Sequence, residues 1–164
     1  VHHGAPAHSA KPGDREVQRV EARAAGPIVY RPGETVLTKD VVMEVAAFRD
    51  GAFRLRERLE GADEIRVFHP AGRPGALGRF ERAIASSKQG RISMDSREGG
   101  WTATGISLVE HDASGERVII EAAPGIPRFR LESKEGVATA RRVVYDLRTG
   151  TLGEWVGLGA ETGK

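Results

Sequence analysis

Histidine, serine and carboxylate side chains are the groups of this chain that could perform catalysis, but their spacing matches no catalytic motif. His69 and His111 are the histidines that follow the first 16 residues. His111 precedes Asp112, and neighbouring residues of a strand point to opposite faces, so the two do not form a ready acid–base dyad. The Ser86–Lys88 segment is not a Ser-x-x-Lys motif, and no glycine-rich loop is placed to bind phosphate. We therefore expect a protein that is not an enzyme.

Metal chemistry has little more support. The chain contains no cysteine, which excludes disulfides, zinc–thiolate sites and cysteine nucleophiles. If Val1 carries a free amine, His3 in third place could help it chelate Cu(II) or Ni(II) in a square plane. His2, His3 and His8 nevertheless lie in a segment rich in Ala, Pro and Gly, where scattered histidines are usually incidental. We expect no cofactor, no metal site, and a flexible leader over residues 1–16.

The charge of the chain is nearly balanced. There are 25 basic and 23 acidic residues, for a net charge of +2, which creates no strong field. A nucleic-acid-binding face would combine clustered basic residues with aromatic ones, whereas here basic and acidic residues alternate along the chain, so we expect no nucleic-acid partner. Six arginines either pair with phosphate groups of a ligand or form a solvated outer face balanced by carboxylates. They are Arg54, Arg56, Arg79, Arg82, Arg141 and Arg142.

The elements that would position these side chains are β-hairpins. Over residues 140–156, two β-favouring runs flank a turn that carries Asp146 and Gly150. The same plan recurs over residues 103–120 and 62–84. A recurrence of this length indicates stacked β units.

Each hairpin buries one apolar face, and two sheets closing on each other would cover these faces. With 164 residues the chain fits one domain. We predict an all-β fold, a single antiparallel β-jelly roll or β-roll built from repeated hairpins, over residues 17–159. Residues 160–164 are expected to form a frayed tail. Pro74 and the Pro124–Pro127 segment interrupt the rhythm, so an uneven sheet is expected there.

The inner face of the predicted hairpins is aliphatic. If the two sheets splay along one side, this face becomes an apolar groove that can hold acyl chains. If they do not, the same residues form a dry core. The sequence leaves both outcomes open. The candidate lipid-binding residues on this face are Ile65, Val67, Phe80, Ile84, Ile106, Leu108, Val118, Ile120, Val143 and Tyr145.

These hairpins resemble the repeats of the OstA-like (LptA) family. The rhythm of that family is an alanine-led strand, a Tyr-Asp-x-x-Thr-Gly turn, and a return strand that ends in glycine. Ala140, Tyr145–Gly150 and Gly157 match it best, and Ala103–Gly115 and Ala62–Phe68 match parts of it.

The resemblance covers residues 35–159 and implies a periplasmic β-jelly roll that carries lipopolysaccharide between the inner and outer membranes. It implies three kinds of partner: lipopolysaccharide or a related lipid, an inner-membrane exporter component, and an outer-membrane translocon with a similar β-fold. End-to-end homo-oligomers are also implied, and unpaired backbone groups at open sheet ends favour such strand addition. The alternative function is a structural β-module that assembles by edge-strand addition and carries no lipid.

Overall fold

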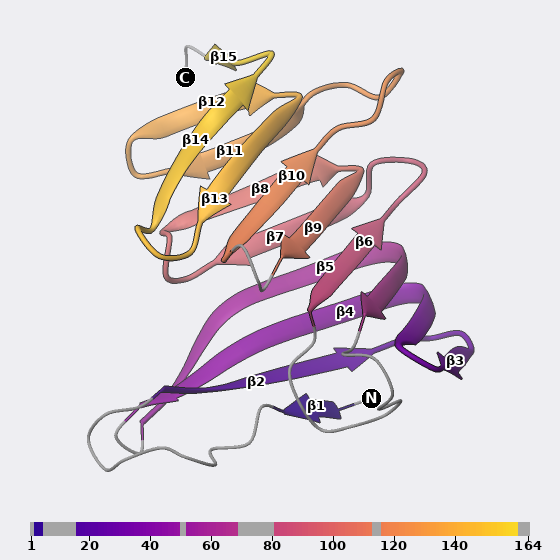
Figure 1. Cartoon of the computed structure of the whole chain (residues 1–164). Helices are drawn as coiled ribbons and strands as arrows, with labels where there is room; N and C mark the ends of the chain where they lie inside the picture. Colours follow the sequence, from indigo (N-terminus) through magenta and orange to yellow (C-terminus); the bar gives the residue numbers. More distant parts are fainter. Residues whose placement is uncertain (1, 5–15, 50–51, 69–80, 113–115, 161–164) are drawn as a thin grey trace.

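The computed structural model describes residues 2–4, 16–49, 52–68, 81–112 and 116–160. Within these ranges the chain forms a 15-stranded antiparallel sheet, which confirms the predicted all-β fold (Figure 1). No helix in these ranges is long and apolar enough to cross a membrane. The strands are β1 (His2–Gly4), β2 (Glu16–Arg23), β3 (Ile28–Arg31), β4 (Glu34–Arg49), β5 (Ala52–Phe68), β6 (Arg82–Ser86), β7 (Ile92–Ser96), β8 (Trp101–Ile106), β9 (Leu108–Asp112), β10 (Arg117–Glu121), β11 (Phe129–Ser133), β12 (Gly136–Ala140), β13 (Arg142–Asp146), β14 (Thr151–Val156) and β15 (Gly159–Ala160).

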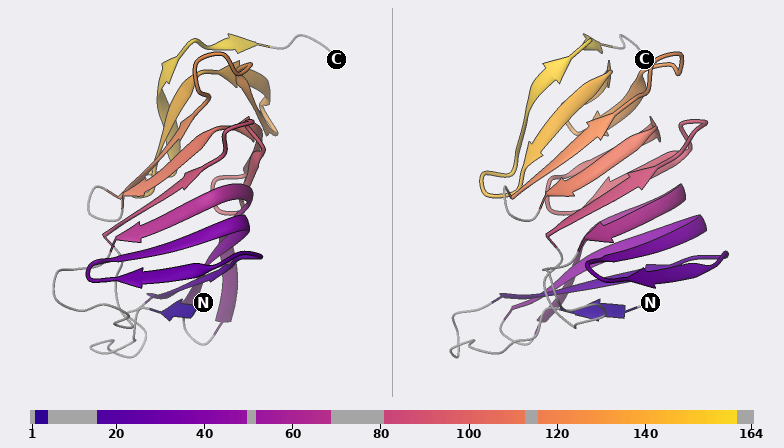
Figure 2. Two further views of the ribbon diagram at one scale, coloured as in Figure 1. Left: turned by 90° about the vertical axis from the view of Figure 1, so that its right-hand side faces the viewer. Right: turned by 45° about the vertical axis from the view of Figure 1, so that its right-hand side comes forward.

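The sheet is folded lengthwise into two half-sheets that face each other (Figure 2). The first half-sheet has the order β3-β4-β5-β6-β9-β10-β13-β14, and the second has the order β1-β2-β4-β5-β7-β8-β11-β12-β15. The long strands β4 and β5 belong to both. Strands β1 to β3 lie at one end of the stack and β14 and β15 lie at the other (Figure 1). The chain therefore builds the molecule hairpin by hairpin from one end to the other.

The fold line, which we call the spine, is where the chain crosses between half-sheets. Strand β4 bends after Thr38, where Lys39 and Asp40 have φ angles of 74° and 47° and the pairing with β5 shifts register. Strand β5 bends at Gly61, whose φ is 86°. Later crossings are short connections that bond to one another through their backbones; the Ser107 N–H, for example, donates to the Glu121 carbonyl at 2.9 Å. Backbone hydrogen bonds therefore close the spine.

The opposite long edge, which we call the hairpin edge, carries the turns that join strands within one half-sheet. The turn between β13 and β14 confirms the predicted roles of Asp146 and Gly150. The Asp146 carboxylate accepts hydrogen bonds from the Arg148 and Thr149 N–H groups at 2.8 and 3.2 Å. Gly150 takes the left-handed conformation at a φ of 72° and donates to the Asp146 carbonyl at 2.8 Å. No backbone ladder joins the two half-sheets at these turns in the described part of the chain.

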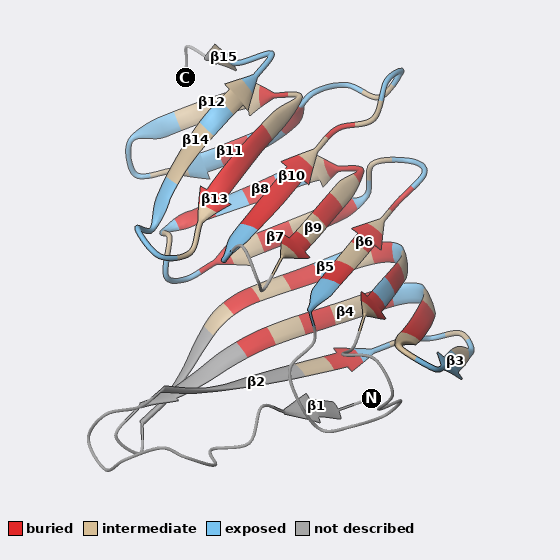
Figure 3. Cartoon of the chain, viewed as in Figure 1, coloured by how far each residue is buried: buried red, intermediate tan, exposed pale blue. Residues whose placement is uncertain are grey.

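Side chains fill the space between the half-sheets in three layers, which the strand registers define and which Figure 3 shows as buried positions alternating along the strands. The spine layer contains Val41, Ala62, Ile92, Ile106, Phe129 and Ala140. The middle layer contains Leu37, Ile65, Ala85, Val109, Ile120 and Val143 from the first half-sheet, and Met43, Leu59, Met94, Ala103 and Leu131 from the second.

The third layer, which we call the rim layer, lies nearest the hairpin edge. It differs from the other two layers because polar side chains interrupt the apolar ones. The first half-sheet contributes Thr35, Val67, Ala83, His111, Val118 and Tyr145, and the second contributes Val45, Glu57, Ser96 and Trp101.

Two residues assigned to the inner face from the sequence do not lie there. Ile84 and Leu108 occupy the outer pleat and are of intermediate exposure, while Ala83, Ala85 and Val109 face inward. Successive side chains of a strand alternate between faces, so a shift of one residue exchanges the two sets. Phe80 lies outside the described residues. The candidates that are buried in the interior are Ile65, Val67, Ile106, Val118, Ile120, Val143 and Tyr145.

The chain termini and the proline segments bear on two further expectations. The His2–Gly4 strand pairs with β2, while residues 5–15 of the predicted leader lie outside the described residues. The leader and the tail therefore stay predictions. The Pro124–Pro127 segment forms a crossing at the spine, and both strands beside it keep their ladders. The sheet is therefore continuous past this segment, contrary to the expected unevenness.

Candidate functional site

The interior between the half-sheets is the main candidate site, because it is apolar along the stack of strands. Ile65, Ile120 and Val143 of the middle layer have no exposed surface at all. Water does not reach these side chains in this closed form. A ligand chain would contact them only after the half-sheets part, and the hairpin edge is where no backbone ladder resists this.

The rim layer holds a group of polar and aromatic side chains that meet across the interior. We call Glu57, Ser96, Trp101, His111 and Tyr145 the rim cluster. The His111 Nδ1 atom of the first half-sheet lies 3.8 Å from the Glu57 Oε1 atom of the second, and both side chains are almost fully buried. The Tyr145 ring meets the Trp101 ring edge-on, with centroids 5.4 Å apart and planes at 78°. The Tyr145 and Ser96 side chains are hydrogen-bonded.

Burial shifts the pKa values of the two ionisable groups in opposite directions, since an apolar environment disfavours the charged form of each. Burial raises the pKa of Glu57 to about 7; Arg56 opposes this shift and Glu98 adds to it. Burial lowers the pKa of His111 to about 4, with Arg56 acting in the same direction and Asp112 against it. At pH 6, therefore, the closed rim holds a neutral carboxylic acid beside a neutral imidazole.

Sequence reasoning identified His111 but missed Glu57. Its only sequence signal was the alternation of β5, which places Glu57 on the same face as the buried Leu59. The expected separation of His111 from Asp112 is confirmed, since Asp112 points to the outer face and lies 3.6 Å from the Arg117 guanidinium. No group of three His, Asp or Glu residues that could hold a metal ion occurs among the residues that the structure describes.

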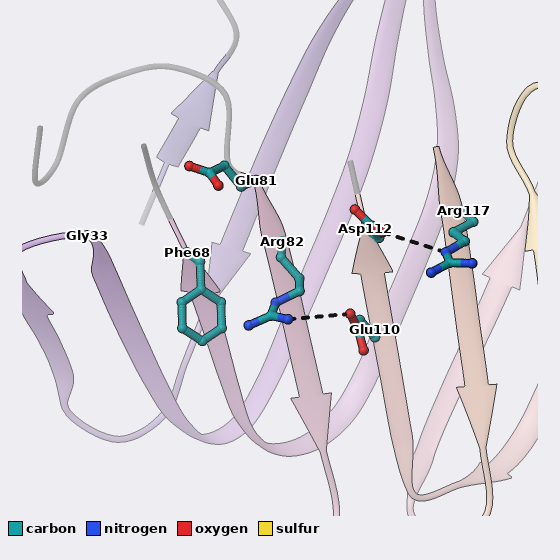
Figure 4. A pocket seen from close by; sticks show the side chains of 7 residues that line it. All are labelled: Gly33, Phe68, Glu81, Arg82, Glu110, Asp112 and Arg117. Carbon is teal, nitrogen blue, oxygen red and sulfur yellow. Dashed lines mark ion pairs between the residues drawn. The ribbon is translucent and has the colours of Figure 1, made fainter. Parts of the chain in front are cut away.

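A polar pocket of about 530 Å³ lies on the outer face of the first half-sheet (Figure 4). The Arg82 guanidinium lies 4.8 Å from the centroid of the Phe68 ring and 3.8 Å from the Glu110 carboxylate. Carboxylates outnumber arginines among the lining residues, so the pocket has no excess of positive charge to attract a phosphate group. The lining residues are Gly33, Phe68, Glu81, Arg82, Glu110, Asp112 and Arg117.

The six arginines singled out from the sequence follow the second of their two interpretations. The side chains of Arg54 and Arg79 lie outside the described residues. Arg141 donates hydrogen bonds to the carbonyl groups of Ala123 and Ile126 at the spine. The other three form ion pairs on the outer face, as expected for a solvated surface. These pairs are Arg56–Glu98 at 2.9 Å, Arg82–Glu110 at 3.8 Å and Arg142–Glu121 at 3.2 Å.

Comparison with known proteins gives one informative result. No protein-family model matches the sequence, and no curated protein matches it. Among solved structures, the chain is similar to LptH from Pseudomonas aeruginosa, described as the LptA-homologous periplasmic component of a lipopolysaccharide transport device. The TM-score is 0.57 at 12% sequence identity, over 82% of this chain and 80% of LptH. At this identity the likeness concerns the fold, and the chain accordingly has the β-jelly-roll fold of an LptA homologue.

Proposed function

We propose that this protein is a non-enzymatic, periplasmic carrier or bridge component that holds lipopolysaccharide, or a similar amphiphile, by its acyl chains between the half-sheets. The observation that carries the proposal is the apolar middle layer, which runs from β4 at one end to β13 and β11 at the other. The fold shared with LptH supports it. The inward residues Ile65, Val67, Val118, Ile120 and Val143 are the proposed contacts, together with Ile106 and Tyr145.

The energetics favour acyl chains as ligands once the hairpin edge parts. Transfer of one methylene group from water to an apolar environment contributes about 0.8 kcal/mol, so a chain of ordinary length would offset the loss of contacts between the two middle-layer faces. The ion-paired outer arginines provide no comparable binding energy for a phosphate group, because surface pairs contribute little.

An acyl amphiphile with a diazirine at the end of its chain tests the proposal without any substitution. We expect photo-adducts on inward side chains of β9, β10 and β13, such as Val109, Ile120 and Val143, as located by peptide mass spectrometry. Their outward neighbours Leu108 and Val144 are the matched internal controls. Adducts that fall on the outward residues alone would contradict an interior lipid site.

Assembly through the ends of the stack is supported by exposed apolar side chains there. Strand β3 pairs only with β4, and β14 pairs only with β13, so each has a free edge. Tyr30 on β3 is 57% exposed, and Val156 on β14 is 52% exposed. Unpaired strand edges beside apolar side chains favour strand addition. We propose that the β3 end of one molecule binds the β14 end of another copy or of a partner with a similar fold.

Two blocked variants distinguish this head-to-tail arrangement from others. Tyr30→Lys blocks the β3 end and Val156→Lys blocks the β14 end, because a charge at a strand edge disfavours pairing. We expect each variant alone to be monomeric in analytical ultracentrifugation, at concentrations where the unaltered protein forms oligomers. An equimolar mixture should form dimers and nothing larger. A Tyr30→Lys variant that still self-associates would instead indicate contact between identical β14 ends.

A further inference from the structure

The rim cluster is unusual because it places an acid and a base in the interior, facing each other from opposite half-sheets. Among the described residues, Glu57 and His111 are the charged-type side chains that are buried. They sit in the rim layer, next to the hairpin edge. Parting the half-sheets there must separate the Glu57 carboxyl from the His111 imidazole and bring both into water. The protonation of this pair is thus tied to opening.

The surroundings of the pair are electrically balanced. On β5 the adjacent Arg56 guanidinium is 2.9 Å from the Glu98 carboxylate of the turn after β7. On β9 the adjacent Asp112 carboxylate is 3.6 Å from the Arg117 guanidinium of β10. Tyr145 of β13 faces the pair with its phenol, whose pKa burial raises, so it stays protonated. Each nearby charge thus has a nearby opposite charge, and the state of the pair depends mainly on its own burial.

We propose that Glu57 and His111 form a proton-sharing clasp: the closed rim holds a neutral carboxylic acid and a neutral imidazole, and opening moves the Glu57 proton to His111. The O–H bond of the carboxyl group breaks and an N–H bond forms on the imidazole. A carboxylate and an imidazolium, both hydrated, remain. No proton is exchanged with the solvent, so the total charge of the pair is the same in both forms.

The titration of the two groups supports this account. In the closed form the pKa of Glu57 is about 7 and that of His111 about 4, so between these values the pair carries one proton, on Glu57. In the open form the ordinary values are 4.5 and 6.5, so between these the pair again carries one proton, now on His111. Because both forms bind the same number of protons, opening is nearly independent of pH from 4.5 to 6.5.

Single substitutions should reveal the two opposed dependences that cancel in the unaltered protein. In Glu57→Gln only His111 titrates; its pKa is lower in the closed form, so acid favours opening. In His111→Gln only Glu57 titrates; its pKa is higher in the closed form, so rising pH favours opening. Each pKa unit corresponds to a tenfold change, so each variant should open roughly 30-fold more at its unfavourable end of the window than at the other.

Hydrogen–deuterium exchange of the rim-side amides of β8 and β9 measures opening, after correction for the intrinsic pH dependence of exchange. Spine amides such as that of Ser107 provide an internal reference for global unfolding. We expect the unaltered protein to change by no more than about twofold between pH 4.5 and 6.5. Glu57→Gln should lose rim protection on acidification, His111→Gln should lose it on alkalinisation, and the double variant should show neither trend. Glu60→Gln, on the outer face of the same strand beside Arg58, should behave as the unaltered protein does.

A slope of the same sign in both single variants would overturn the clasp, as would a tenfold change of rim protection in the unaltered protein over this window. Glu57→Gln is nearly isosteric, and its acid-dependent opening decides the matter even if His111→Gln does not fold. The experiment contains no lipid. A negative result therefore leaves the proposed acyl-chain binding standing, and a failure of acyl-chain binding leaves the clasp standing.

Discussion

Replacing Gly61 by alanine is expected to destabilise the protein by roughly 3 kcal/mol, measured as the free energy of unfolding in urea. Strand β5 crosses between the half-sheets at this residue, with a φ of 86° that disfavours any side chain. An added Cβ would also overlap the carbonyl oxygen of Arg91. That oxygen belongs to the backbone connection before β7, so it cannot rotate away as a side chain would.

Gly150→Ala is the matched control. Gly150 has a similar φ of 72°, but an added Cβ there would meet no atom within 4 Å. We expect a loss of only about 1 kcal/mol, from the left-handed backbone alone. Equal losses in the two variants would show that close packing at the spine does not contribute. An unchanged midpoint for Gly61→Ala would contradict the bend itself.

Replacing Val109 by aspartate is expected to abolish binding of a fluorescent acyl probe, with the dissociation constant rising by well over tenfold. Val109 is 2% exposed and lies in the middle layer. A carboxylate there would face the proposed acyl chain without a partner, and burying an unpaired charge is costly by several kcal/mol. Leu108→Asp on the same strand places the same charge on the outer pleat, where we expect binding to be unchanged.

Two measurements keep this prediction separate from a loss of folding. Circular dichroism must show an unaltered β spectrum for Val109→Asp. If it does not, Val109→Thr, which keeps the shape and adds one hydroxyl group, should weaken binding to a smaller extent while the protein stays folded. A folded Val109→Asp variant that binds as the unaltered protein does would exclude the interior as the lipid site. Loss of binding in Leu108→Asp would point to the outer face instead.

The local elements of this fold were predictable because their causes are local. Alternation of apolar and polar residues indicated strands, including a strand rather than a helix at Phe53–Arg56, and β5 confirms it. Asp146 and Gly150 indicated a turn whose hydrogen bonds the structure contains. The lipid-binding role of the inward residues depends on more than these causes and stays a prediction.

The errors of the inner-face assignment arose at the spine. Ile106 and Leu108 were expected to share one strand face, but the crossing at Ser107 places them in different half-sheets and on different pleats. At Ile84 the small neighbours Ala83 and Ala85 face inward instead. Size and hydrophobicity favour the larger side chain for the interior, whereas the register with β5 and β9 determines which one lies there.

The sequence by itself determined the strands, the turns and the repetition of hairpins, since each depends on residues that are close together in the chain. The tertiary structure alone decided which faces meet. Folding one sheet along the bends of β4 and β5 brings Glu57 to within 3.8 Å of His111 and Trp101 against Tyr145. The physical reason is that contacts across the interior depend on backbone bends and register shifts summed over the whole sheet, which no local pattern of residues encodes.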